Sequence, residues 1–491
     1  MNPQPVLSKS KYMEGLQCSK LLWYEYNRKE DLPPIHPTTQ AKFDLGNQIG
    51  LLAQQLFPSG IKLERSLSPE QHSEQSLKAV ALRKPLFEAG FIFANGYALA
   101  DILNPVEGDA WDLVEVKSAT EIKEEYHHEV AFQKHVYEGS GLKIRRCYLM
   151  HINNEYVRQG DIDPNQLLKM VDITEDVKAL QAEVAKTVES MAALIRQSET
   201  PDTKIGPHCD DPYECKLKDI CWGFVPDKDS VFVLSRGKKL AFSLLENNIL
   251  KVVDIPDKTK LTDNQRMQLK VHRTGTPHID LEALKQFMGT LKYPFYFLDF
   301  ETIDPAIPRF DLSRPYEKIA FQYSLFIIPK KGDAPQRHGF LWKATDDPRP
   351  EFLKKLKALL GSAGSIIAYN APFEIAAIKN ACEAYPEYKE WFEGIKPRFA
   401  DLYAPFRSFN YYHPDQQGSA SIKYVLPALT GKGYKDMNIT DGLMASLEYS
   451  RITFTAGIPE AERQRIYADL EEYCDLDTRG MIDILQNLEK L

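Results

Sequence analysis

A buried strand that ends in two acidic residues constrains this chain more than any other feature. Residues 293–298 form an apolar, aromatic run, and Asp299 and Glu301 continue it. A short apolar run of this kind predicts a buried strand. Side chains two residues apart on a strand point to the same side of the sheet. One strand therefore directs two carboxylates at one spot.

A second pair of candidate catalytic residues lies near the C-terminus. Tyr473 and Asp477 are four residues apart in a segment, 468–488, whose apolar residues recur with helical spacing. Residues four apart share one face of a helix, so both side chains project together. Between the two pairs, Glu374 lies at the start of an expected helix, 373–384.

Four carboxylates and a tyrosine suit the hydrolysis of phosphodiester bonds with two divalent ions. Hard oxygen ligands hold such ions, one of which activates water while the other stabilises the leaving oxygen. The predicted ligands of Mg²⁺ or Mn²⁺ are Asp299, Glu301, Glu374 and Asp477. We expect the hydroxyl of Tyr473, one helical turn before Asp477, to orient the attacking water.

The same residues resemble the motifs of the DEDD exonucleases, tyrosine subtype, in the DnaQ and ribonuclease-H-like group. Asp299-Phe-Glu301 is similar to their first motif, and Tyr473-Cys-Asp-Leu-Asp477 is similar to their third. Asn-Ala-Pro-Phe-Glu374 is similar to the second. The resemblance implies a ribonuclease-H-like domain with a mixed, helix-flanked sheet.

One residue departs from that family pattern. The second motif usually closes with aspartate, and Glu374 is one methylene longer. A glutamate still binds metal but shifts the ion or its water, which implies reduced activity or another metal preference. Asp401 is a nearby substitute ligand. A plainer alternative treats Asp299 as a strand cap, Glu374 as an acid at a helix N-terminus and Asp477 as a surface acid.

A second candidate site lies in the first half of the chain. Asp101 belongs to the strand-like segment 91–103, and Glu115 and Lys117 end a second strand-like segment, 111–116. Glu115 and Lys117 share one strand face. Two acids that bind metal and a lysine that positions water are the parts of a hydrolytic metal site. This set resembles the Asp…Glu-x-Lys arrangement of restriction-type, or PD-(D/E)xK, nucleases.

The next expected helix makes that resemblance more specific. Gln133 and Tyr137 lie on one helix face and resemble the Gln-x-x-x-Tyr motif of RecB-type nucleases. The resemblance implies a restriction-endonuclease-like domain, with all five residues at its active site. The alternative is a surface ion-pair ladder across a hairpin beside an ordinary amphipathic helix.

Four cysteines lie at the two ends of this first half. Cys18 is near its start, and Cys209, Cys215 and Cys221 are near its end. The arrangement resembles RecB-like nucleases that carry a four-iron (4Fe–4S) cluster, including those associated with CRISPR systems. Four thiolates also suit structural zinc, which stays open as the alternative.

Composition limits the class of protein. The chain has 491 residues, a hydrophobic share of 43% and seven cysteines, which favours substantial cores and a reducing compartment. The first eleven residues do not resemble a signal peptide, and no apolar run approaches about 20 residues. We expect a cytoplasmic protein without a membrane partner. A net charge of −8 means that binding of nucleic acid needs local basic groups or metal ions.

These patterns predict an α/β protein with two nuclease-like domains. We expect a RecB-like domain over 1–225, a connector over 226–290 with weak similarity to a helix-hairpin-helix element, and a DEDD-like domain over 291–491. The expected function is metal-dependent hydrolysis of DNA, single-stranded or at ends. Three alternatives stay open: a single active site with the other domain as a clamp, RNA as the substrate of the C-terminal site, and a non-catalytic nucleic-acid-binding module. A helicase or a repair or defence complex is the expected partner.

Overall fold

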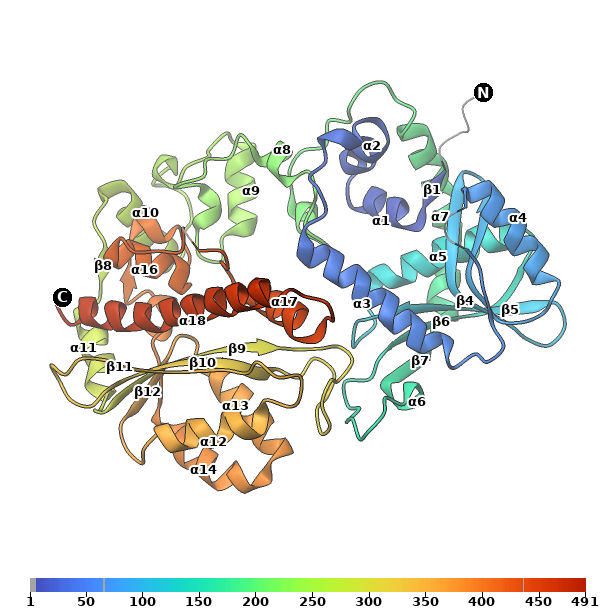
Figure 1. Cartoon of the computed structure of the whole chain (residues 1–491). Coiled ribbons are helices and arrows are strands. Elements are labelled where there is room, and N and C mark those ends of the chain that lie inside the picture. Colours follow the sequence, from blue (N-terminus) through green and yellow to red (C-terminus); the bar gives the residue numbers. More distant parts are fainter. Residues whose placement is uncertain (1–5, 65–66, 436) are drawn as a thin grey trace. The chain divides into compact units, whose positions relative to one another are not determined.

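The computed structural model of the protein describes residues 6–64, 67–435 and 437–491 (Figure 1). The chain forms two compact units. Unit 1 comprises Met1–Phe224 and Ala306–Tyr316, and unit 2 comprises Val225–Pro305 and Glu317–Leu491. Each unit has a sheet and hydrophobic clusters of its own. Within the described ranges, no helix combines the length and the apolar character needed to cross a bilayer.

Unit 1 is built on a seven-stranded mixed sheet of order β2-β3-β4-β5-β6-β7, with β1 paired to β4. The pairs β3–β4, β4–β5 and β6–β7 are antiparallel, whereas β1–β4, β2–β3 and β5–β6 are parallel. The strands are β1 (Leu7–Ser8), β2 (Ile61–Lys62), β3 (Leu86–Phe93), β4 (Gly96–Pro105), β5 (Ala110–Lys117), β6 (Lys143–Ile152) and β7 (Leu168–Asp172).

Helices cover both faces of this sheet because its strands are apolar on both sides. Leu113 packs in a cluster with residues of α1, α5 and α7, and its neighbour Val114 packs in a cluster with residues of α3. The helices of unit 1 are α1 (Lys9–Gln17), α2 (Ser19–Asn27), η1 (Lys29–Asp31), α3 (Pro37–Gln54), α4 (Pro69–Val80), α5 (Glu124–Gly139), α6 (Pro164–Leu167), α7 (Thr174–Leu194), η2 (Pro207–Cys209) and α8 (Lys218–Trp222).

The prediction of one continuous strand over 91–103 is wrong. The segment is the hairpin of β3 and β4, in which Phe93 pairs with Gly96. Ala94 and Asn95 between them have φ values of 45° and 69°. Positive φ at both central residues is the geometry of a two-residue hairpin turn. Asp101 therefore lies on β4, the middle strand of a three-stranded antiparallel meander.

Unit 2 is built on a five-stranded mixed sheet of order β11-β10-β9-β12-β13. The pairs of β10 with β9 and β11 are antiparallel, and those of β12 with β9 and β13 are parallel. The strands are β9 (Phe295–Ile303), β10 (Ile319–Ile328), β11 (Gln336–Leu341), β12 (Ser365–Ala368) and β13 (Phe399–Asp401), with β8 (His278–Ile279) and β14 (Tyr411–Tyr412) as a separate pair.

Helix α18 runs along one face of this sheet, and α12, α13 and α14 cover the other (Figure 1). The helices of unit 2 are η3 (Val231–Val233), α9 (Lys238–Glu246), η4 (Val252–Asp254), α10 (Asp263–Thr274), α11 (Leu281–Thr290), α12 (Arg349–Leu359), α13 (Pro372–Ala384), η5 (Pro386–Tyr388), α14 (Lys389–Ile395), η6 (Lys396–Arg398), α15 (Ala404–Arg407), η7 (Pro414–Gln416), α16 (Ile422–Thr430), α17 (Gly442–Phe454) and α18 (Glu460–Leu488).

Alternation along β9 decides which side chains face α18. Phe295 and Phe297 pack in the cluster that contains residues of α18, whereas Tyr296 and Leu298 pack in the cluster that contains residues of α12 and α13. The odd-numbered residues that follow, Asp299 and Glu301, therefore share the α18 face.

The expected mixed α/β architecture is confirmed in both halves of the chain. The connector over 226–290 belongs to unit 2, where it forms η3, α9, η4, α10, β8 and α11. Within this connector, residues 237–256 are the stretch with weak similarity to a helix-hairpin-helix element. They form α9 followed by a single 3₁₀ turn, η4. A separate segment, Ala306–Tyr316, leaves the loop after β9 and packs within unit 1, where the hydroxyl of Tyr316 donates to the carbonyl of Ser118.

Candidate functional site

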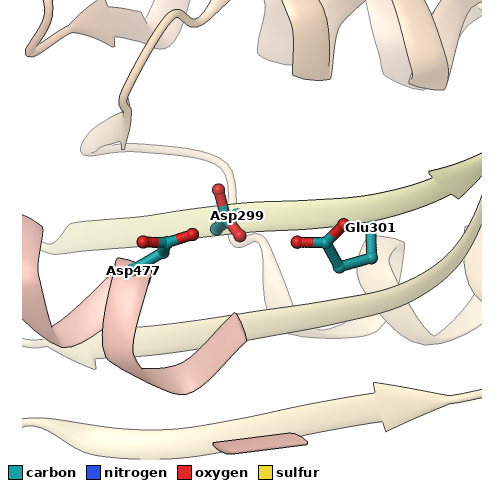
Figure 2. A group of neighbouring side chains, drawn as sticks. All are labelled: Asp299, Glu301 and Asp477. Atoms are coloured by element: carbon teal, nitrogen blue, oxygen red, sulfur yellow. The ribbon is translucent and has the colours of Figure 1, made fainter. Parts of the chain in front are cut away.

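Three carboxylates of unit 2 converge at one point. Asp299 and Glu301 come from β9 and Asp477 comes from α18, and their ligand atoms all lie within 4.8 Å of one another. Figure 2 shows Asp299 between the other two, with the carboxylates directed toward one another. In the part of the chain that the structure describes, this is the one group of three or more His, Cys, Asp or Glu residues at such spacing.

Helix α18 positions Asp477 through its buried face. The buried face of this helix follows an i, i+3, i+4, i+7, i+11 pattern: Leu470, Tyr473, Cys474, Asp477 and Met481. This spacing is the apolar stripe of a helix that packs on a sheet. Asp477 occupies a position in the stripe that an apolar residue would normally take, so its carboxylate points at β9. Tyr473 lies one turn earlier, as expected.

The acids line a cavity of about 540 Å³. Aromatic side chains form part of its wall, and a polar loop that leads into α16 forms another part. The lining residues are Asp299, Phe300, Glu301, Tyr369, Asn370, Phe373, Tyr403, Ser419, Ala420, Ser421, Ile422, Gly442, Tyr473 and Asp477. The cavity thus combines carboxylates, aromatic rings and hydroxyl groups on one surface.

The electrostatics of this group favour the uncharged acids. Burial raises the pKa of Asp299 well above its usual range, and the charge of Asp477 raises it further. Burial, followed by Asp299, does the same to the pKa of Glu301. Burial also raises the pKa of Asp477 to about 6. Over residues 6–64, 67–435 and 437–491, no Lys, Arg or His forms a salt bridge with any of the three. A cation is the species that would relieve this repulsion.

Glu374 stays outside the group of three. It lies in the first turn of α13 with 1% of its surface exposed, and it does not line the cavity. Its Oε2 has no hydrogen-bond partner among the described residues. Burial raises the pKa of Glu374 well above its usual range, and Asp299 is the next contributor. The side chain is therefore electrostatically coupled to Asp299 without sharing its ligand sphere in this conformation.

Asp401, the substitute ligand, has a structural task. Its Oδ1 accepts hydrogen bonds from the backbone N–H groups of Asn370 at 2.9 Å, Ala371 at 3.3 Å and Tyr403 at 3.1 Å. Asn370 has a φ of 76°, a conformation that few residues other than glycine adopt. Asp401 thus stabilises the turn that carries the chain from β12 into α13.

Tyr434 lies beside the acids and was not among the residues predicted for this site, and Lys423 lies near it. The hydroxyl of Tyr434 donates to Oδ1 of Asp477. The ammonium of Lys423 lies 6.0 Å from the ring centre of Tyr434 and 5.8 Å from that of Tyr473, and it donates to the carbonyl of Thr440 at 2.5 Å. Lys423 also lowers the pKa of Asp477 through its charge. Nothing in the sequence around Tyr434 indicates its contact, because 43 residues separate it from Asp477.

Asp475 provides an internal contrast on the same helix. It lies between Tyr473 and Asp477, but its carboxylate accepts from Ser324 at 2.8 Å and from Arg337 at 2.5 Å. Two residues along a helix are about 200° apart, so Asp475 faces away from the three acids. Arg337 forms a salt bridge with Asp475, whereas Asp477 has no salt-bridge partner among the described residues.

The predicted site of unit 1 is also assembled. Gln133 Nε2 donates to Glu115 Oε2 at 2.7 Å, and Lys117 Nζ lies 2.9 Å from Glu115 Oε1. Asp101 Oδ2 accepts from the backbone N–H of Val116 at 2.8 Å. Burial, followed by the charge of Glu115, raises the pKa of Asp101 to about 7. The four residues come from β4, β5 and α5.

Two further charged residues enter this site. Lys9 of α1 forms salt bridges with Glu115 and with Glu129 Oε2, the second at 3.5 Å. Lys117 reaches the same Glu129 oxygen at 2.6 Å. Burial alone would raise the pKa of Glu115, but Lys117 and Lys9 lower it to about 2. Glu129 precedes Gln133 by four residues on α5, a spacing that the sequence did offer.

Tyr137 lies in the core of unit 1. Its ring packs edge-on against Phe91 at 5.4 Å, and it is fully buried. Within the described residues its hydroxyl has no hydrogen-bond partner. Burial raises its pKa well above the usual range. A buried hydroxyl without a hydrogen-bond partner is energetically costly.

The four cysteines pack in one cluster of unit 1, together with Leu21 and Leu217. Cys18 lies between α1 and α2, and Cys209 accepts a hydrogen bond at its sulfur from the backbone N–H of Gly206 at 3.5 Å. Burial raises the pKa of Cys215 to about 11. The sulfur atoms of these four residues, which include Cys221, do not meet the 4.8 Å mutual spacing found for the acids of unit 2.

Comparison with known proteins finds similarity between the region of the acids and a family of unknown function. Residues 296–421 match a family described as a domain of unknown function, DUF2779. This range contains Asp299, Glu301 and Glu374 and ends before Tyr473 and Asp477.

Two bacterial proteins show more extended similarity. The chain is 27% identical over 236 residues to uncharacterized protein UU173 of Ureaplasma parvum. The aligned region covers 43% of this chain and 33% of the relative. It is 25% identical over 225 residues to uncharacterized protein MG366 of Mycoplasma genitalium, with 42% and 34% covered. The chain thus spans about a third of the length of these relatives.

Proposed function

We propose that this protein is a metal-dependent nuclease whose catalytic centre is the group Asp299, Glu301 and Asp477. The observation that carries the proposal is the convergence of three carboxylates, without a salt-bridge partner among the described residues, on the wall of a cavity of about 540 Å³. Buried like charges are costly unless a cation joins them. Carboxylate oxygens are the ligands that Mg²⁺ and Mn²⁺ prefer.

Asp299, Glu301 and Asp477 would hold divalent ions, which would supply activation of water and stabilisation of the leaving oxygen of a phosphodiester. Glu374 would be the further acid, since its Oε2 has no hydrogen-bond partner among the described residues. Tyr473 lines the cavity and orients the attacking water through its hydroxyl. Lys423 contributes positive charge toward the phosphate.

The substrate that suits this cavity is single-stranded DNA, or the frayed end of a duplex. Tyr369, Phe373 and Tyr403 supply aromatic faces in the lining, and unpaired bases stack on such faces without regard to sequence. Paired bases inside a duplex do not offer their faces. We also propose that unit 2 is a ribonuclease-H-like domain of the DEDD type.

The contacts of Gln133 and Lys117 with Glu115 favour a second nuclease-like site, of the RecB-like, PD-(D/E)xK type, in unit 1. The four cysteines pack in one cluster, which supports a 4Fe–4S group there, with structural zinc as the alternative. The N–H of Gly206 donates to the sulfur of Cys209, and such donors tune iron–sulfur clusters.

The test compares two aspartates on one helix. Purified Asp477→Asn and Asp475→Asn proteins are assayed on end-labelled single-stranded DNA, duplex DNA and RNA with Mg²⁺ or Mn²⁺. We expect Asp477→Asn to lose metal-dependent cleavage and Asp475→Asn to retain it, because Asp475 points away from the acids. Equal activity in both variants would show that the acids are not the catalytic centre. Tight binding of DNA without product under either metal would identify a binding module instead.

A further inference from the structure

We infer that Lys9 is an internal cation of the unit 1 site, and that a divalent ion binds at Asp101 and Glu115 only when the Lys9 side chain withdraws. The inference rests on the second, unit 1 site of the proposed function. It is independent of the three acids of unit 2.

The ligand atoms that a metal needs in unit 1 are already engaged. Both Lys9 and Lys117 contact Glu115 Oε1 and Glu129 Oε2, so that two ammonium groups and two carboxylates close a ring of salt bridges. Gln133 Nε2 donates a hydrogen bond to the other carboxylate oxygen of Glu115, Oε2, at 2.7 Å. The residues therefore do not fit a divalent ion in this arrangement, although the donor types are suitable.

Lys9 is the member of the ring that is best placed to leave. Its side chain is 24% exposed, whereas that of Glu115 is 2% exposed and that of Lys117 is 17% exposed. Lys9 is the first residue of α1, and the long, unbranched side chain has many rotamers that reach solvent. The helix itself is anchored, because Tyr12 stacks on Phe132 at 4.7 Å. A side-chain rotation therefore opens the site without unfolding α1.

The charge of Lys9 opposes binding of a divalent ion at this site. With Lys9 in place the ring is neutral, and an incoming divalent ion meets two ammonium groups beside Glu115. Without Lys9 the ring carries one net negative charge, and Asp101 adds a further acid nearby. Charges a few ångströms apart at a partly buried site interact strongly enough to change affinity by an order of magnitude or more. Loss of Lys9 should therefore strengthen metal binding.

The test uses the full chain with Asp299→Asn and Glu301→Gln, so that Mn²⁺ binding reports unit 1. In that background, Mn²⁺ affinity is measured by electron paramagnetic resonance for Lys9→Met and for Lys11→Met. We expect Lys9→Met to bind Mn²⁺ at least about tenfold more tightly than the background. Adding Glu115→Gln to Lys9→Met should abolish the gain.

Lys11→Met is the matched control. Lys11 lies on the same helix and forms salt bridges with Glu14 at 2.9 Å and Glu25 at 2.6 Å, away from the site. Its loss should leave Mn²⁺ affinity unchanged. Lys9→Arg, which keeps the charge, should also bind Mn²⁺ as weakly as the background, and Lys9→Gln replaces Lys9→Met if the latter does not fold.

Two results would overturn the inference: no gain in Mn²⁺ affinity on removing the charge of Lys9, or an equal gain in Lys11→Met. Neither result bears on cleavage by the acids of unit 2, which is assayed separately in the chain with those acids intact. The proposed nuclease centre of unit 2 and the role of Lys9 can therefore fail independently.

Discussion

The two acidic sites use the same residue types but differ in how their charges are balanced. In unit 1, Glu115 lies between Lys9 and Lys117, and these lysines lower its pKa to about 2. In unit 2, burial raises the pKa values of Asp299 and Glu301, and no lysine forms a salt bridge with them in the described residues. The acids of the unit 1 site are paired with cations of the chain, whereas the described residues provide no salt-bridge partner for the three acids of unit 2.

The difference shows that proximity of carboxylates alone does not make a metal centre. A buried acid that is already ion-paired contributes to the stability of the fold, and removing one partner leaves the other charge uncompensated. Buried acids without cationic partners are destabilising until a metal binds. Neutralising a buried acid should therefore destabilise unit 1 and stabilise unit 2.

The largest expected effect is on cleavage by unit 2. The double change Asp299→Asn and Glu301→Gln should reduce metal-dependent cleavage of single-stranded DNA by about 10³-fold, because the ions lose charged ligands worth several kcal/mol in the transition state. Initial rates on end-labelled DNA measure the loss. If cleavage survives this double change and disappears in Glu115→Gln, the comparison is reversed and unit 1 is the catalytic centre.

The next effect is a loss of stability in unit 1. Glu115→Gln should lower the free energy of unfolding near pH 7 by about 3 kcal/mol, because Lys9 and Lys117 lose a buried partner. The folded-state pKa of Glu115 lies below its ordinary value of 4.5, so this stabilisation is present above about pH 4.5 and is lost as pH falls toward 2. Urea unfolding across this pH range checks the expectation. A variant as stable as the parent near pH 7 would contradict the ion-pair account.

The third effect has the opposite sign. Glu374→Gln should raise the free energy of unfolding by about 2 kcal/mol near pH 8, since it removes a buried acid whose Oε2 has no partner. Burial raises the folded-state pKa of Glu374, so the parent chain is most stable when this acid is protonated and loses that stability as pH rises. The gain in the variant should vanish near pH 4. A destabilised variant near pH 8 would show that the Glu374 carboxylate is held by a favourable contact.

The smallest effect concerns metal affinity in unit 2. Because the pKa of Asp477 is about 6, protons compete with metal below that pH, and Mn²⁺ affinity should fall about tenfold between pH 7 and pH 5. Calorimetric titration of Mn²⁺ at several pH values measures the decline. The decline should be weaker in Asp477→Asn, and a parent chain with flat affinity over this range would remove Asp477 from the ligand set.

Local patterns in the sequence predicted much of both sites. The alternation of β9 and the four-residue spacing of Tyr473 and Asp477 place these groups as expected, because a strand and a helix have fixed periods. The same periods failed at 91–103, where a two-residue turn interrupts an otherwise continuous apolar pattern. Periodicity does not register a reversal of chain direction that spans only two residues.

Contacts between distant segments lay outside what local patterns predict. Lys9 reaches Glu115 across 106 residues and Tyr434 reaches Asp477 across 43, and neither contact follows from spacing. Glu374 closes the expected second motif, yet packing of α13 against the sheet leaves it outside the group of three acids. Each of these outcomes depends on how helices dock, which is a property of the whole core.

By itself, the sequence determined which side chains share a strand face or a helix face, because backbone geometry sets those periods within a few residues. It also determined the residue types, and therefore the chemistry, that each site offers. Only the tertiary structure decided which charges meet. Lys9 from α1 joins Lys117 in pairing with Glu115 and Glu129 of unit 1, and no lysine forms a salt bridge with the three acids of unit 2 in the described ranges. Long-range packing sets these distances, on which electrostatic energy depends.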